Sequence, residues 1–89
     1  MPLVVVPPPY RGPTGGAAEI RVDAATVREC IEAVEARFPG FGNQVLDGQG
    51  VPHRFVSLFV NGEEIDREGL DARVAGADRI EILAAIAGG

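Results

Sequence analysis

The sequence predicts a small α+β domain in which one amphipathic helix covers one face of a mixed β-sheet. Three observations predict this class: helical periodicity over residues 27–38, short segments that alternate apolar and polar residues, and an apolar strand near each end of the chain. At 89 residues, the chain is long enough for one domain with one hydrophobic core.

Composition narrows the class of protein further. The hydrophobic content of 46% and charged content of 24% are typical of a folded domain. A net charge of −5 argues against nucleic acid or an anionic membrane as a partner. The single cysteine excludes an intramolecular disulfide, and the apolar residues 1–6 are too few for a signal peptide or a spanning helix. We therefore expect a cytoplasmic domain.

The first half of the chain reads as a hairpin followed by the helix. Residues 3–6 are expected to form an apolar strand, which ends at Pro7–Pro9. Residues 10–16 form a turn-rich connector, and residues 19–23, which alternate polar and apolar, form the return strand. Thr26 and Glu29 fit a capping box that opens the helix. Pro39-Gly40 ends it, and its apolar stripe contains Val27, Cys30, Ile31, Val34 and Phe38.

The second half reads as a hairpin, a loop and a last strand. One helical turn is expected at residues 43–46, and the strongest strand at residues 55–60. Asn61-Gly62 predicts a tight turn into a short return strand at residues 63–65. In the loop of residues 66–78, Leu70 and Val74 are expected to plug the core, and residues 79–83 form the last strand.

This element order predicts a ubiquitin-like β-grasp fold. The first and last strands, both short and apolar, would pair in parallel at the centre of the sheet. Residues 1–83 would form the domain, and residues 84–89 a flexible, extended C-terminal tail. The tail ends in Gly88-Gly89, which lets a backbone without side chains enter a narrow space and present a terminal carboxylate there. An accidental glycine ending is the alternative.

The order and the ending together resemble the ubiquitin-like sulfur carrier family of the MoaD/ThiS type, over essentially the whole chain. The resemblance rests on Thr26-Val27-Arg28-Glu29, Arg37-Phe38-Pro39-Gly40, Val60-Asn61-Gly62-Glu63, Asp78-Arg79-Ile80-Glu81-Ile82-Leu83 and Ala87-Gly88-Gly89. His53-Arg54-Phe55-Val56 and the ending Ala85-Ile86-Ala87-Gly88-Gly89 look most like the CysO type. Two departures, Ala75-Gly76-Ala77-Asp78 in place of an acidic turn and Ala84 in place of a proline, bear on partner choice.

The resemblance implies a protein co-substrate rather than an enzyme. A partner adenylyltransferase would use ATP to adenylate the Gly89 carboxylate, with Gly88 allowing the tail to thread, and a sulfur donor would then give a thiocarboxylate. The carrier would bind no cofactor or metal itself. An acceptor synthase would take the sulfur for cysteine, a cofactor or a metabolite such as a thiosugar. The resemblance also leaves room for a metalloprotease that trims the tail.

Two other functions stay open at this point. The chain could be the small subunit of molybdopterin synthase, with the same tail inside a larger partner. It could also be a β-grasp protein modifier or a non-catalytic interaction module. The chain has no lysine, and all eight of its basic residues are arginine. This would protect an activated carboxyl group from the protein's own amines, or it could reflect a genome rich in G and C.

A docking patch is expected on the uncovered face of the sheet. If Val56, Leu58 and Val60 face the helix, then Phe55 and Phe59 point the other way. Arg54 and Arg79 would flank this patch and guide an acidic groove of the partner, and Ile86 and Ala87 of the tail would contact the partner too. The opposite phasing would place both phenylalanines in the core.

Other reactive-looking residues have simpler interpretations. Cys30 lies in the apolar stripe and is expected in the core. His53 is a lone loop histidine without neighbouring ligands, so a structural or surface role is expected. The glutamates at positions 29, 32 and 35 read as a solvated helix face.

Overall fold

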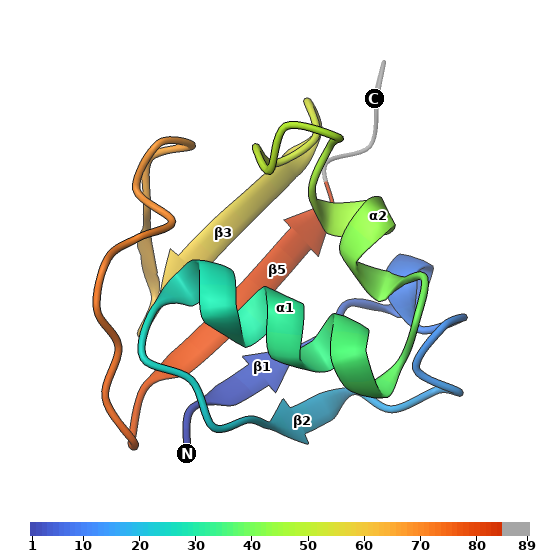
Figure 1. Cartoon of the computed structure of the whole chain (residues 1–89), viewed down its shortest axis with the longest axis horizontal. Helices are drawn as coiled ribbons and strands as arrows, with labels where there is room; N and C mark the ends of the chain where they lie inside the picture. The colour runs from blue at the N-terminus through green and yellow to red at the C-terminus, as the bar shows by residue number, and fades with distance from the viewer. Residues whose placement is uncertain (85–89) are drawn as a thin grey trace.

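One mixed sheet with a helix across one of its faces organises the chain. The structure is a computed structural model that describes residues 1–84. The sheet of these residues has five strands in the order β2-β1-β5-β3-β4. The strands are β1 (Leu3–Val5), β2 (Glu19–Arg21), β3 (Val56–Val60), β4 (Glu63–Glu64) and β5 (Arg79–Ala84). Figure 1 shows α1 (Val27–Arg37) lying across the sheet.

The central pairing joins the two ends of the chain, as predicted. Strands β1 and β5 run parallel with Val4 opposite Ile80, whereas the β1–β2 and β3–β5 pairs are antiparallel. Val4 and Ile80 are completely buried, because both point towards α1. The apolar strands at the two ends of the sequence thus form the centre of the sheet, and the predicted β-grasp arrangement is confirmed.

Helix α1 begins where its capping residues predict. The Thr26 hydroxyl oxygen accepts a hydrogen bond from the Glu29 N–H at 3.1 Å. The Glu29 carboxylate accepts from the Ala25 N–H at 3.1 Å, one residue before the position that a standard capping box uses. The helix ends at Arg37, and Gly40 follows with a φ of 102°, a value that favours glycine. The local sequence signals therefore set both ends of the helix.

The core lies between α1 and the sheet. The buried side chains of α1 are Val27, Cys30, Ile31 and Val34, and they pack with those of the strands. Leu70 is completely buried and plugs the core from the loop, as predicted, while Val74 packs against it half-buried. Burial of a side chain such as Leu70 stabilises the fold by about 1.5–3 kcal/mol.

Two short helical segments complete the layer around α1. Helix α2 (Phe41–Val45) begins two residues before the predicted turn, because Phe41 is a fully buried core residue. A 3₁₀ turn, η1 (Pro8–Tyr10), is formed by two of the prolines that end the first strand and by the first residue of the predicted connector. Both segments bring apolar residues to the edge of the core.

The β3–β4 turn has the conformation that its sequence predicts. Asn61 and Gly62 have φ values of 52° and 86°, both left-handed, as two-residue hairpin turns with Asn-Gly require. The Asn61 side-chain amide donates to Asp78, and its oxygen accepts from the Arg79 N–H, each at 2.9 Å. The turn is therefore fixed to the start of β5.

Several strand boundaries differ from the prediction by a residue or two. Strand β3 starts at Val56 rather than Phe55, because the Val56 N–H donates to the His53 carbonyl in a turn. Strand β2 ends at Arg21 rather than residue 23. Strand β5 continues to Ala84, which pairs with Val56.

The prediction that three glutamates of α1 form a solvated face is wrong for Glu35. Its carboxylate is half-buried and accepts hydrogen bonds from the Gly40 and Gly42 N–H groups, the second at 2.9 Å. Glu35 therefore links α1 to the start of α2. Glu29 and Glu32 are exposed, as predicted.

Candidate functional site

The end of β5 is the place from which the predicted reactive tail continues. Strand β5 lies between β1 and β3, and its last residue, Ala84, pairs with Val56 at the start of β3. Figure 1 shows this end of β5 on the side of the sheet opposite the N-terminus. The predicted tail residues Ile86, Ala87, Gly88 and Gly89 lie outside the described residues.

The uncovered face of the sheet carries the residues that alternate with the core. Val56 is 4% exposed and Leu58 is 2% exposed, so Phe59 between Leu58 and Val60 points to the other face. Phe59 is half-buried and does not pack against the hydrophobic core. The predicted phasing is confirmed for Phe59, whereas Phe55 precedes β3 in a turn and is not placed by the alternation of the strand. We call this uncovered side the open face; it is formed by Leu3, Val5, Glu19, Arg21, Ser57, Phe59, Glu64, Arg79, Glu81 and Leu83.

Two of the predicted partner-binding residues lie beside the end of β5. Arg54 and Phe55 come just before Val56, which is opposite Ala84. Phe55 is 44% exposed, and the Arg54 guanidinium carbon lies 5.4 Å from its ring centroid, a cation–π distance. An exposed aromatic ring and a cation therefore stand where the chain leaves the sheet.

Arg79 lies at the opposite end of β5. Five residue steps separate it from Ala84, about 17 Å along a strand. Its guanidinium lies 3.6 Å from the Glu81 carboxylate and 3.9 Å from that of Glu19. Arg54 and Arg79 thus lie near opposite ends of the β3–β5 pair, and the charge of Arg79 is balanced within the sheet. That the two arginines guide an acidic groove stays a prediction.

A row of acidic and apolar residues crosses the middle of the open face. The strand register places Glu64 opposite Phe59, Phe59 opposite Glu81, Glu81 opposite Val5, and Val5 opposite Glu19. Three carboxylates therefore alternate with two apolar side chains across all five strands.

Sequence reasoning missed one prominent apolar residue of this face. Leu83 is 48% exposed and lies opposite Ser57, one pair away from the end of β5. Alternation with the buried Ile80 and Ile82 is the signal that could have identified it. Leu83 extends the apolar part of the open face towards Phe55.

The other reactive-looking side chains have structural surroundings. Cys30 is fully buried, and burial, with Glu29 and Asp78 as lesser causes, raises the pKa of its thiol to about 11. The thiol therefore stays protonated and poorly nucleophilic at neutral pH, as a core residue would. The His53 Nε2 lies 2.7 Å from the Asn43 carbonyl oxygen. Residues 1–84 contain no group of three potential metal ligands.

No helix within residues 1–84 has the length and apolar character needed to cross a membrane.

Comparison with known proteins agrees with this geometry. The ThiS family matches residues 11–89 of the chain. The sulfur carrier protein CysO of Mycobacterium tuberculosis is 34% identical over 97% of this chain and 96% of its own length, and the CysO of Mycobacterium bovis matches equally.

Solved structures give the same result. CysO in the Amycolatopsis orientalis BexX/CysO complex superposes with a TM-score of 0.89 and 36% identity over the full length of both chains. The M. tuberculosis CysO structure has a TM-score of 0.87 and 30% identity, covering 97% of this chain and all of the other. The modifier protein SAMP1 of Haloferax volcanii, at 21% identity and a TM-score of 0.82, shares the fold. The chain therefore belongs to the ThiS family, as a sulfur carrier protein of the CysO type.

Proposed function

We propose that this protein carries sulfur as a thiocarboxylate on Gly89. The carboxylate oxygen of Gly89 would attack the α-phosphate of ATP in a partner adenylyltransferase, which releases pyrophosphate and forms an acyl-adenylate. A sulfur nucleophile would then attack the acyl carbon and release AMP. The observation that carries the proposal is a central strand, β5, that ends at Ala84, five residues from the end of a sequence that closes with Gly88-Gly89.

Each part of the tail suits this chemistry. An α-carboxyl group has a pKa of about 3.3–3.7, so it is ionised at neutral pH without help. Residues 85–89 can reach roughly 17 Å beyond Ala84 when extended, at about 3.3–3.6 Å per residue. The carboxylate could therefore enter the active site of a partner while the folded body stays outside. The protein would act as a co-substrate, and ATP would be bound by the partner.

The open face supplies a docking surface next to the end of β5, where the tail begins. Phe55 and Leu83 present exposed apolar surface next to the end of β5, and Phe59 extends it along β3. Buried aromatic anchors with a polar surround are typical of protein interfaces. The relative solved as a BexX/CysO complex supports a carrier that docks on a second protein.

Primary amines attack activated acyl groups, so the lack of lysine would protect an activated carboxyl group at Gly89. With no lysine in the chain, the N-terminal amine is the one primary amine of the protein. It precedes β1 at the opposite end of the sheet from the exit of β5 (Figure 1). Separation along the sheet would slow capture of the activated carboxyl group within one molecule.

Intact-mass spectrometry tests the proposed function. The protein would be incubated with ATP, a sulfide source and its adenylating enzyme, and we expect the mass increase of an oxygen-to-sulfur exchange. Gly88→Ala should impair that exchange and leave the fold unchanged, because residue 88 lies beyond the last strand. Covalent adducts on other proteins would instead indicate a modifier, and an unchanged mass would indicate an interaction module.

A further inference from the structure

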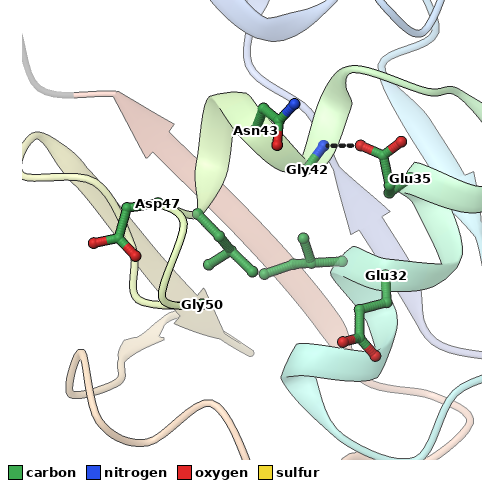
Figure 2. A pocket seen from close by; sticks show the side chains of 8 residues that line it. Glu32, Glu35, Gly42, Asn43, Asp47 and Gly50 are labelled. Atoms are coloured by element: carbon green, nitrogen blue, oxygen red, sulfur yellow. Dashed lines mark hydrogen bonds between the residues drawn. The ribbon is translucent and has the colours of Figure 1, made fainter.

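A groove lies on the helix side of the protein, away from the open face. It has a volume of about 340 Å³, near the lower end of the range for ligand pockets, and opens between α1, α2 and the loop that follows α2. Its lining residues are Ile31, Glu32, Glu35, Gly42, Asn43, Leu46, Asp47 and Gly50. Figure 2 shows Asp47 on one side of it and the two glutamates of α1 on the other.

The walls of the groove are fixed and partly free of side chains. Ile31 and Leu46 supply its apolar surface, and Gly42 and Gly50 contribute backbone alone. The Glu35 carboxylate accepts a hydrogen bond from the Gly42 N–H (Figure 2), and Arg28 donates a hydrogen bond to the Gly50 carbonyl at 2.7 Å. A Cβ on Gly50 would lie 2.8 Å from the Arg28 Nη1, so that position leaves little space for a side chain.

The rim of the groove is acidic, and two of its carboxylates can take a further partner. Among residues 1–84, Glu32 is exposed and makes no ion pair. Asp47 uses one oxygen, Oδ1, for the Gln49 and Val51 N–H groups at 2.8 and 3.1 Å, which leaves Oδ2. No basic residue lines the groove, and the nearby Arg28 is paired with Asp71 at 3.1 Å.

We propose that this groove is a docking site for an arginine or lysine side chain of a partner protein. The aliphatic stem would lie on Ile31 and Leu46, and the charged head would reach Glu32 or Asp47 at the rim. Long basic side chains combine these two properties, and a guanidinium also matches carboxylate geometry. The proposal concerns a second surface and does not depend on the chemistry of the tail.

A consequence is that two partners could be held at once. The groove lies on the helix-covered side, whereas Phe59, Glu81 and Leu83 lie on the open face. A protein that engages the groove would leave the open face free.

Amide chemical-shift titration tests the docking site with small probes. The probes are acetyl-arginine amide, acetyl-citrulline amide, which has nearly the same shape without the charge, and acetyl-norleucine amide, which is apolar. We expect saturable shifts at residues 31–35 and 42–50 with the arginine probe, weakened by salt, and much smaller shifts with citrulline. Equal shifts from arginine and citrulline, or larger ones from norleucine, would overturn the assignment of a basic occupant.

Neutralised variants test which carboxylates take part. The double variant Glu32→Gln with Asp47→Asn keeps the side-chain oxygen that caps the loop and should weaken arginine binding at least about threefold. Glu63→Gln with Glu68→Gln removes the same charge from exposed positions outside the groove and should bind as the unmodified protein does. Equal weakening in both variants, or no shifts with any probe, would contradict the proposal.

Discussion

The two faces of the sheet are built from the same strands, yet they carry opposite properties. On the covered face, Val4, Leu58 and Ile80 are at most 2% exposed and form the core under α1. On the open face, the neighbouring positions hold Phe59 and Glu81, which remain accessible to a partner. The covered face therefore provides stability, and under the proposed function the open face provides recognition of a partner. Substitutions on each face test this distinction.

The largest effect on stability is expected at the centre of the covered face. Ile80→Ala should lower the free energy of unfolding by about 2–5 kcal/mol, because it leaves a cavity at a completely buried position of the central strand. Urea denaturation measures this loss. Glu81→Ala, the next residue and on the open face, is the matched control and should cost no more than about 1 kcal/mol. Similar losses in the two variants would contradict the division between faces.

On the open face, the larger effect should be on recognition. Phe59→Ala should reduce kcat/KM of the adenylating enzyme for this carrier about tenfold, which corresponds to about 1.4 kcal/mol of lost interface energy. Its free energy of unfolding should change less than that of Ile80→Ala, because Phe59 lies outside the core. Pyrophosphate release at varied carrier concentration is the readout, with Glu63→Ala at the sheet edge as control. A normal rate for Phe59→Ala would remove Phe59 from the docking surface.

Sequence patterns predicted the local features of this fold well. Thr26 sets the start of α1, and Asn61 and Gly62 set the β3–β4 turn. These effects depend on residues close by in the sequence, so a short sequence pattern predicts them. The parallel pairing of β1 with β5 was also predicted, because both strands are apolar.

Side-chain contacts between distant segments were not predicted. Arg28 pairs with Asp71, 43 residues away, and Glu35 caps a helix that begins only after the chain has turned at Gly40. The walls of the groove depend on the Glu35 contact and on the hydrogen bond from Arg28 to the Gly50 carbonyl, and no periodicity in the sequence indicates either of them. For the proposed reactive site, the identity of the terminal residues was known from the sequence, whereas the place from which they continue, the end of β5, is known from the fold.

A smaller loss of stability is expected on substitution of Thr26, the residue that caps the start of α1. Thr26→Ala should cost about 1 kcal/mol, because the Glu29 N–H loses its acceptor at the helix start. Thr26→Ser keeps the hydroxyl group and should retain most of the stability. Thermal or urea unfolding of the two variants measures the difference. If the serine and alanine variants were equally destabilised, the hydroxyl group would not be the stabilising element.

The smallest effect is a dependence on pH at the start of β5. Hydrogen bonds from the Ala75 N–H and the Asn61 amide lower the pKa of Asp78 below its ordinary value of 3.8. A lowered pKa favours folding when the carboxylate is ionised, so this contribution is present above about pH 4 and is lost as the pH falls through the folded pKa. Urea midpoints at pH 6 and pH 3 should therefore differ more for the unmodified protein than for Asp78→Asn. If the urea midpoint fell equally between pH 6 and pH 3 in the unmodified protein and in Asp78→Asn, a contribution from Asp78 would be excluded.

The most direct test of the central claim removes the reactive group alone. A semisynthetic protein that ends in a Gly89 amide has the same sequence and fold but no terminal carboxylate. With ATP, sulfide and the adenylating enzyme, the acid form should exchange oxygen for sulfur at Gly89, and the amide form should release no pyrophosphate and gain no sulfur. Pyrophosphate release or sulfur incorporation with the amide form would show that the carboxylate is not the carrier group.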